Sequence, residues 1–493
     1  MKADYENERY RCCLEILSPV HIGCDEIYEP TGFILDEQVH QIIVFEPFDF
    51  ISKLESGEKQ RFSDICRKGT IGSILEVYKF FQGKSAAGRR VKVCNDFPEH
   101  FRQTIALDVR NEKRVGQELN NFQIARTAYL PGNDRPYIPG SAIKGAIRTA
   151  YLNNRASDVN IIVRPGKYAS RMLEERLLDY RGIPGDPFRL VKVSDFRPVG
   201  DVHTKILYAV NEKKVLGGQS ARGPVQIFEV VEKGGLFEGV ITVEKPHAGA
   251  KINHAVTLHG LLSSCLGFYN KQKIREMEEL SKIGVKFDIT GKQEDLEKGT
   301  PVRIGHHSGA EAVTIEGHRR IKIMGRRGEK PQILPYATTL WLASESRKPQ
   351  QKMALRPFGW AQLNRVTAVR EQDIEKAEGE YHDSMGRELG SVSIDVKQNG
   401  ALRTAADAKA SEGSTPKKKQ EPIRESWKNI LLVWTPNNGV ITAVSSGKKA
   451  TTSDKNLVPE KIHKKLFGKK KRAKVETVVV EKLGRAFVII NVS

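Results

Sequence analysis

The stretch YIPGSAIKGAIRT, residues 137–149, carries the sharpest local signal in the sequence. Pro139 and Gly140 form a turn signal, and Ser141 is a suitable N-cap for a helix that starts at Ala142. A helix N-terminus exposes backbone N–H groups and carries partial positive charge, so it suits a phosphate. The spacing therefore predicts a capped helix whose start is able to bind an anion.

The same helix carries two cations on one face. Lys144 and Arg148 are four residues apart, and Gly145 beside them has no side chain to keep a ligand or a backbone at a distance. These residues suit the sugar-phosphate backbone of a nucleic acid, and the alternative is an ordinary capped helix. We take Gly140, Ser141, Lys144 and Arg148 as candidate RNA-binding residues. The spacing is not that of a phosphate-binding P-loop.

A second short segment, residues 302–311, combines one arginine, two glycines, a serine and two histidines. Such residues suit close approach to phosphates or bases, and the candidates are Arg303, Gly305, His306, His307, Ser308 and Gly309. A metal site is disfavoured, because adjacent histidines in a strand point to opposite sides and the sequence places no partner carboxylate. We therefore expect no metal and no cofactor.

Two further segments hold candidate residues. Arg356 lies near Phe358 and Trp360, where an arginine and aromatic rings are able to stack on bases, although both rings could equally be core residues. His21 follows a strand in residues 17–23, and a lone histidine is more often structural than a general base. No nucleophile, base and orienting group form a set, and we assign Asp195 no catalytic role.

The chain around these segments mixes strands and helices. A hairpin is expected from Gly32–Asp36 and Gln41–Phe45, and a glycine pair at 234–235 is expected to join two neighbouring strands as a second hairpin. The remaining expected elements are strands at 10–17, 190–193, 205–210, 225–231, 236–243 and 339–343, helices at 71–81, 142–152 and 168–180, and a helical stretch at 254–283 interrupted around Gly267.

The charge of the chain is high and uneven. Its 493 residues carry a formal net charge of +20. Residues 411–493 hold 18 Lys and Arg against 7 Asp and Glu, a net charge of +11. This concentration favours contact with a polyanion over general solubility. The basic residues Lys469, Lys470, Lys471 and Arg472 in that region are candidate RNA-binding residues.

The region after residue 425 has four β-type runs, at 430–434, 440–444, 475–480 and 486–490. They are compatible with a small barrel that binds nucleic acid or with a plain β appendage. Residues 371–424 are polar, and most of this segment is expected to be a flexible linker. The sequence therefore predicts an ordered, basic C-terminal domain after a linker.

Other classes of protein are disfavoured. No apolar run reaches the roughly 20 residues of a membrane span, and the start of the chain lacks the apolar region of a signal peptide. The six cysteines form no Cys-x-x-Cys pair. A reducing cytoplasm fits this usage.

The four segments at 17–23, 138–149, 303–309 and 358–360 occur in an order that resembles the RAMP superfamily of CRISPR proteins. Pro-Gly-Ser-x-x-Lys-Gly-x-x-Arg is a superfamily marker. The Arg-x-Gly-x-x-Ser-Gly loop followed by Phe-Gly-Trp resembles the fifth Csm subunit of type III-A effector complexes. The resemblance covers roughly residues 10–366, and the linker and basic C-terminal region depart from it.

The resemblance implies an α+β fold of tandem RRM-like (ferredoxin-like) domains with insertions. We accordingly expect a first RAMP domain at 1–199, a second at 200–366, a linker at 367–425 and a basic β-rich domain at 426–493. It implies a non-enzymatic RNA-binding subunit that caps the backbone filament near the CRISPR RNA 3′ end and supports 3′-end maturation and antiviral defence. Its partners would be CRISPR RNA, other Csm subunits including the backbone RAMP subunit, target RNA indirectly, and host nucleases.

Three alternatives stay open at this point. The first is a metal-independent RAMP endoribonuclease that processes precursor CRISPR RNA, with His21 as base and Lys144 as charge stabiliser. The second is another RAMP subunit of a type III complex. The third is a general RNA-binding protein without a CRISPR link.

Overall fold

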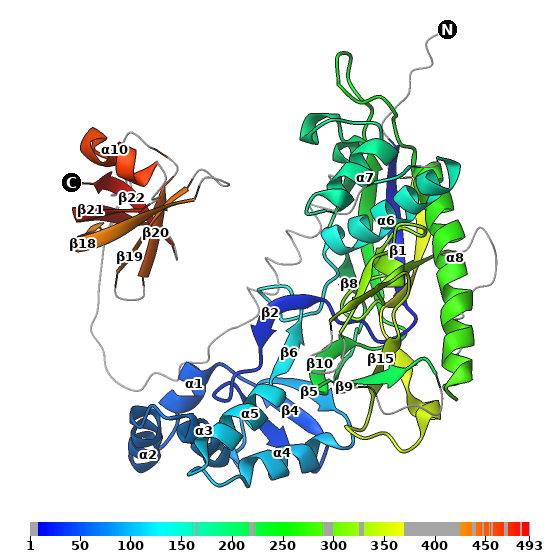
Figure 1. Ribbon diagram of the computed structural model, residues 1–493. Helices are drawn as coiled ribbons and strands as arrows, with labels where there is room; N and C mark the ends of the chain where they lie inside the picture. The colour runs from blue at the N-terminus through cyan, green and yellow to red at the C-terminus, as the bar shows by residue number, and fades with distance from the viewer. Residues whose placement is uncertain are drawn as a thin grey trace, which may run out of the picture. The chain divides into compact units, whose positions relative to one another are not determined.

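The computed structural model divides the chain into two compact units, Met1–Ser393 and Ile394–Ser493 (Figure 1). No helix in the described part of the chain is long and apolar enough to cross a membrane. The structure describes residues 8–159, 161–163, 166–215, 221, 223–287, 289, 299–324, 330–368, 424–435, 440–445, 448–452, 454, 457–467, 472–483 and 486–492.

The first sheet of the N-terminal unit is antiparallel and has six strands in the order β12-β17-β1-β11-β7, with β8 also paired to β11. Alternate residues of β1, such as Cys12, Leu14 and Ile16, are buried, as expected for a strand with one face on a core. Helices α6 and α8 contact each other and β12. The bounds are β1 Glu8–Ile16, β7 Val191–Val193, β8 Arg197–Val199, β11 Leu236–Val243, β12 Thr300–Arg303, β17 Trp360–Ala368, α6 Gly140–Asp158, α7 Ala169–Leu177 and α8 Leu258–Lys282.

The second sheet has nine strands, with β2-β6-β10-β9-β5-β4-β3 as its main path and β15 and β16 joined through β9. The pairs β6–β10 and β5–β9 are parallel. Helices α1 to α5 gather around β4 and β5 (Figure 1). The bounds are β2 Gly23–Ile27, β3 Phe33–Asp36, β4 Gln41–Val44, β5 Arg89–Val93, β6 Ile124–Thr127, β9 Thr204–Lys213, β10 Gln226–Val231, β15 Thr339–Ser344, β16 Arg356–Pro357, α1 Pro47–Ser52, α2 Ser56–Arg67, α3 Ile71–Phe81, α4 Phe97–Ile105 and α5 Glu112–Asn121. A separate pair is formed by β13 Ile321–Ile323 and β14 Gln332–Leu334.

The mixed α+β class is confirmed, but three finer expectations are wrong. Each sheet takes strands from both sides of residue 199, so the chain does not divide there into two separately folded domains. The turn at Gly234-Gly235 does not close a hairpin, because β10 belongs to the second sheet and β11 to the first. Helix α8 continues through Gly267 without interruption.

The C-terminal unit is a closed barrel in the order β18-β19-β20-β22-β21. Its interior is an apolar core of its own that includes Trp427, Leu432, Ile441, Val478 and Ile489. The four predicted β runs are confirmed, while β20 and the short helix α10 were not expected. Most of the predicted linker, residues 369–423, lies outside the described residues. The bounds are β18 Arg424–Thr435, β19 Val440–Ser445, β20 Lys448–Thr452, α10 Glu460–Leu466, β21 Arg472–Leu483 and β22 Ala486–Val492.

Candidate nucleic-acid interface

Helix α6 starts in tight contact with strand β7. A Cβ atom at Gly140 would lie 2.2 Å from the carbonyl oxygen of Val193, so only glycine fits at this position. The backbone N–H of Gly140 donates to Asp195 Oδ1 over 2.9 Å, whereas the side chain of Ser141 is exposed and caps nothing. The expected Ser141 N-cap is therefore wrong, and Asp195 satisfies the helix start.

This arrangement changes where an anion would bind. The carboxylate of Asp195 already accepts from the first turn of α6 and complements its partial positive charge. A phosphate at the same point would meet that negative charge. The helix terminus itself is thus a poorer phosphate site than the sequence indicates.

A basic pocket lies beside this helix. Its volume is about 810 Å³, and its lining includes five cationic side chains and one carboxylate, Glu244. The cations are Lys144, Arg189, Lys192, Lys245 and Lys251. They come from α6, from β7 and the turn before it, and from the segment after β11. We call this cavity the basic pocket.

Lys144 links the superfamily-marker segment to the basic pocket. Its Nζ donates to the carbonyl oxygen of Val191 over 2.8 Å, which holds the ammonium group against β7. Burial, followed by the positive charge of Lys192, lowers the pKa of Lys144. An incoming phosphate would relieve this repulsion between Lys144 and Lys192.

Arg148 does not face the basic pocket as a free cation. Its guanidinium donates to Glu174 over 2.7 Å and forms an ion pair with Asp186 at 3.0 Å, and it covers the ring of Phe188 at 4.9 Å. These contacts tie α6 to α7 and to the segment before β7. Arg148 therefore has a structural role, and the RNA contact predicted for it stays a prediction.

The structure brings three of the four sequence segments together at one junction. The N–H of His306 donates to the carbonyl oxygen of His21 over 2.8 Å, and the N–H of Gly359 donates to that of Pro19 over 2.9 Å. Gly305 has φ +82°, and a Cβ there would lie 2.4 Å from the His21 oxygen. The segment at 138–149 instead packs on β7, so the four segments do not form one surface.

Several candidates at this junction are buried. Trp360 is 0% exposed, and its Nε1 donates to Glu276 over 2.5 Å. Arg303 pairs with the same carboxylate at 2.7 Å, both side chains being 3% exposed. Ser308 is also buried, and its hydroxyl donates to the carbonyl oxygen of Gly305. Arg303, Ser308 and Trp360 thus hold the core rather than present groups to RNA.

Three imidazoles surround the ring of Phe228. His21 stacks on it at 4.4 Å, and His306 and His307 lie 5.3 and 5.4 Å from it. Burial lowers the pKa of each, that of His307 to about 3. His307 also stacks on Trp341 at 4.4 Å. Only His306 is exposed, so it is the residue of this cluster that is accessible to a ligand.

His21 is poorly placed for base catalysis. It is 3% exposed, and its Nδ1–H donates to the carbonyl oxygen of Glu229 over 2.8 Å. This bond fixes the tautomer and holds the ring against Phe228. We interpret His21 as structural.

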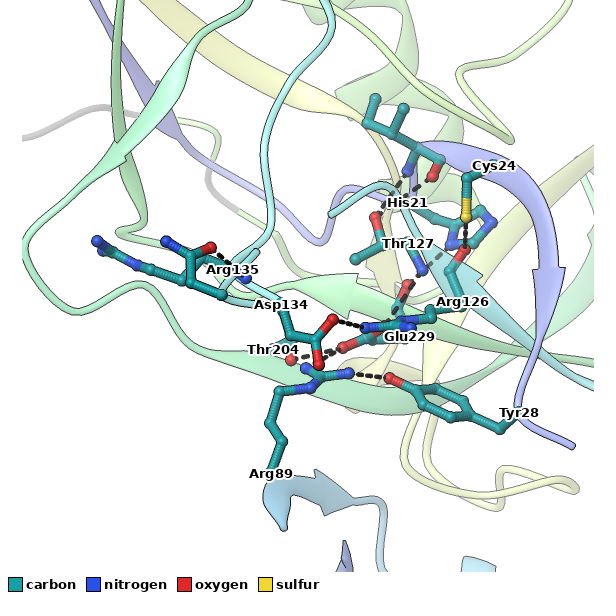
Figure 2. Close-up of polar contacts among 12 residues, drawn as sticks. His21, Cys24, Tyr28, Arg89, Arg126, Thr127, Asp134, Arg135, Thr204 and Glu229 are labelled. Atoms are coloured by element: carbon teal, nitrogen blue, oxygen red, sulfur yellow. Dashed lines mark hydrogen bonds and ion pairs between the residues drawn. The ribbon is translucent and has the colours of Figure 1, made fainter. Parts of the chain in front are cut away.

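Below His21 lies a buried polar cluster centred on Glu229 (Figure 2). Its carboxylate accepts from Arg89 over 2.9 Å, from the Thr204 hydroxyl over 2.8 Å and from the Thr127 N–H over 3.2 Å. Arg89 in turn donates to the hydroxyl of Tyr28. The cluster joins β5, β6, β9 and β10. It therefore fixes the second sheet next to Phe228, the β10 residue on which His21 stacks.

Some of the remaining candidates lie outside the described part of the chain. Lys469, Lys470 and Lys471 lie outside the described residues, and Arg472 begins β21 with an exposed side chain. Arg356 donates to the carbonyl oxygens of Met353 and Leu355 over 2.7 and 2.8 Å. Gly309 has φ +80°, which suits the tight loop that contains it.

Sequence reasoning missed most of the basic pocket. Arg189, Lys192, Lys245 and Lys251 belong to no motif, and they lie in two separate short stretches of the sequence, 189–192 and 245–251. The one available signal was their position near the ends of predicted strands at 190–193 and 236–243. Their convergence depends on the pairing of β7 with β11, which periodicity does not specify.

Comparison with known proteins identifies relatives of the chain. The sequence model of the RAMP superfamily matches residues 13–313. The chain is similar to the CRISPR system Cms protein Csm5 of Methanocaldococcus jannaschii, with 26% identity over 195 residues, and the match spans 37% of this chain and 41% of that relative.

Two solved structures are also similar. One is a chain of the Csm-crRNA-target RNA ternary complex of a type III-A CRISPR-Cas system, with 19% identity, a TM-score of 0.48, and coverage of 73% of this chain and 100% of that chain. The other is T. onnurineus Csm5, with 18% identity, a TM-score of 0.40, and coverage of 71% and 99%. At this level of likeness neither structure adds to the assignment. Because the superfamily model spans more than half of the sequence, the chain belongs to the RAMP superfamily.

Proposed function

We propose that this protein is the RNA-binding subunit of a type III-A CRISPR effector complex that holds the 3′ part of the CRISPR RNA. The observation that carries the proposal is the basic pocket, which lies beside the superfamily-marker helix and has five cations against one carboxylate. Membership of the RAMP superfamily and the similarity to a Csm5 protein support the choice of complex.

The position of the subunit follows from the same proposal. It caps the filament of backbone RAMP subunits near the 3′ end of the CRISPR RNA, contacts other Csm subunits, and meets target RNA only through the complex. It supports 3′-end maturation by positioning host nucleases, and it acts in the cytoplasm. In this proposal the fold also consists of tandem RRM-like domains.

The proposed subunit does not cut RNA itself. An endoribonuclease that uses His21 as its base would need that imidazole to reach a ribose hydroxyl. His21 is instead buried, stacked on Phe228 and bonded to the Glu229 carbonyl group. These contacts favour a binding role over the endoribonuclease alternative.

RNA binding across a salt series tests the proposal. The variant is Lys144→Gln/Lys192→Gln in the full chain, and Lys59→Gln/Lys113→Gln is the matched control, because those two exposed lysines lie on α2 and α5. Each phosphate contact with a single strand contributes about 0.7 to the salt slope, so losing two lowers the slope by about 1.4 and weakens binding roughly 25-fold at about 0.1 M salt.

The control should bind like the unmodified chain. Arg148 is left intact, because replacing it would break the contacts between α6 and α7 and confuse binding with stability. Equal affinities and slopes for the variant and the control would refute RNA binding at the basic pocket.

A further inference from the structure

The strand order of the C-terminal barrel is a specific one. Strand β18 pairs with both β19 and β21, β19 pairs with β20, and β22 lies between β20 and β21. The pair β20–β22 is parallel. Along the chain, helix α10 lies between β20 and β21, the third and fourth strands in sequence order. This order, this parallel pair and this helix position are the topology of the OB fold. OB folds bind oligonucleotides on the face of their second and third strands.

The outward residues of β19 and β20, the second and third strands of the barrel, belong to a row that continues onto β18 and β21. Val433 pairs with Arg472 on one side and with Thr442 on the other, and Thr442 pairs with Thr451. Side chains that oppose each other in antiparallel strands point to the same face. The row therefore crosses β21, β18, β19 and β20 and offers a surface of small and aliphatic side chains.

Two aliphatic side chains stand out into solvent on the same strands. Leu431 is 48% exposed and Val444 is 56% exposed. They alternate with the buried residues Leu432 and Ala443, so they belong to the outward set. Exposed aliphatic groups next to a row of threonines give unpaired bases a surface to pack on, which the stacked bases of a duplex do not need.

The same face is flanked by cations. Arg472 and Lys474 are exposed on β21, and Lys474 pairs with Leu431. Neither has an ion-pair partner among the described residues. Residues 424–493 hold 15 Lys and Arg against 5 Asp and Glu. This charge suits the phosphates of a nucleic acid rather than an average protein surface.

We propose that the outward face of β21, β18, β19 and β20 is a second nucleic-acid site, which binds single-stranded RNA through phosphate contacts to Arg472 and Lys474 on β21. Bases pack on Leu431 and Val444, and no hydrogen bonds to base edges are required. Binding is therefore tolerant of sequence and steeply dependent on salt. The site is distinct from the basic pocket and does not depend on the proposed function.

The test uses the full chain with the basic pocket already disabled by Lys144→Gln/Lys192→Gln. Binding of a fluorescent oligouridine of roughly 12 nucleotides, about one OB-fold site, is measured by anisotropy. We expect this background chain still to bind. Adding Arg472→Gln/Lys474→Gln should weaken binding roughly 25-fold at about 0.1 M salt and lower the salt slope by about 1.4.

The matched control adds Lys465→Gln/Lys322→Gln to the same background, because these exposed lysines lie on α10 and β13 and removing them changes the net charge equally. It should bind like the background. A duplex of the same length should bind more weakly than the single strand. A DNA strand of the same length keeps the phosphates but lacks ribose, so comparing its affinity with that of the RNA strand shows whether ribose contributes to binding.

Two results would overturn the proposal. One is equal binding by the Arg472→Gln/Lys474→Gln chain and the control. The other is no binding of oligouridine by the background chain at low salt, which would leave the face to a protein partner. In both cases the effect of Lys144→Gln/Lys192→Gln on the otherwise unmodified chain tests the proposed function separately. Thermal denaturation should match among all variants, because the replaced side chains are exposed or half-buried.

Discussion

The Gly140→Ala substitution examines how helix α6 is held, and its effect is predictable from the structure. The new Cβ would lie 2.2 Å from the Val193 oxygen and 2.6 Å from the Ser194 oxygen, and both are backbone atoms. Strand β7 cannot easily move, because it pairs with β11 and the Ser194 N–H donates to Val240. The start of α6 must therefore move away from the sheet.

The expected cost has two parts. Overpacking costs about 1–3 kcal/mol, and the loss of the hydrogen bond from Gly140 to the Asp195 carboxylate costs about 1.5–3 kcal/mol. We expect about 3–5 kcal/mol in total. Gly145→Ala is the control on the same helix, because nothing lies within 4 Å of its Cβ position, and alanine should stabilise the helix there by up to about 1 kcal/mol.

Hydrogen exchange followed by mass spectrometry measures both effects on peptides from α6. Since about 1.4 kcal/mol corresponds to a tenfold change, a loss of 3 kcal/mol should speed exchange by roughly 100-fold. Gly145→Ala should slow exchange slightly. Exchange in Gly140→Ala as slow as in the unmodified chain would refute the close contact between α6 and β7.

Three further outcomes are expected. Burial keeps His307 neutral, with a pKa of about 3 against 6.5 in the unfolded chain. The free energy of unfolding therefore decreases as pH falls below 6.5, by about 2 kcal/mol between pH 7 and pH 5. His307→Phe should remove that loss in urea denaturation at the two pH values, and an unchanged loss would contradict the assignment to His307. Arg303→Met should lower the free energy of unfolding by about 3–5 kcal/mol, because Glu276 is left buried without its cation. Adding Glu276→Gln should restore part of that free energy. A loss below about 1 kcal/mol in the same assay would refute the buried ion pair. Gly305→Ala should lower the melting temperature, because its Cβ would strike the His21 oxygen and φ is +82°; an unchanged melting temperature would argue against the junction.

Local elements were predictable where the sequence pattern is local. The hairpin of β3 and β4 and the helix at Ile71–Phe81 follow from turn residues and apolar spacing. The C-terminal strands were visible as four apolar runs. Sheet membership was not predictable, because the turn at Gly234-Gly235 looks the same in sequence whether it closes a hairpin or passes the chain between two sheets.

The candidate site was predicted in part, for a similar reason. Lys144 was found because it lies in a motif, but the motif also contains Arg148, whose partners Glu174 and Asp186 come from later in the chain. A cation that binds RNA and a cation that ties two helices together look alike until their neighbours are known. Trp360 and Arg303 illustrate the same limit, since only the fold reveals Glu276 beside them.

The central claim is that the basic pocket holds the 3′ part of the CRISPR RNA in an assembled complex. The most direct measurement places a photo-crosslinking amino acid at position 192, in place of the exposed Lys192, and sequences the RNA attached after irradiation of the purified complex. We predict crosslinks to nucleotides in the 3′ part of the CRISPR RNA, and none from the same amino acid at position 59. Crosslinks confined to the 5′ part, to target RNA or to another protein subunit would contradict the account.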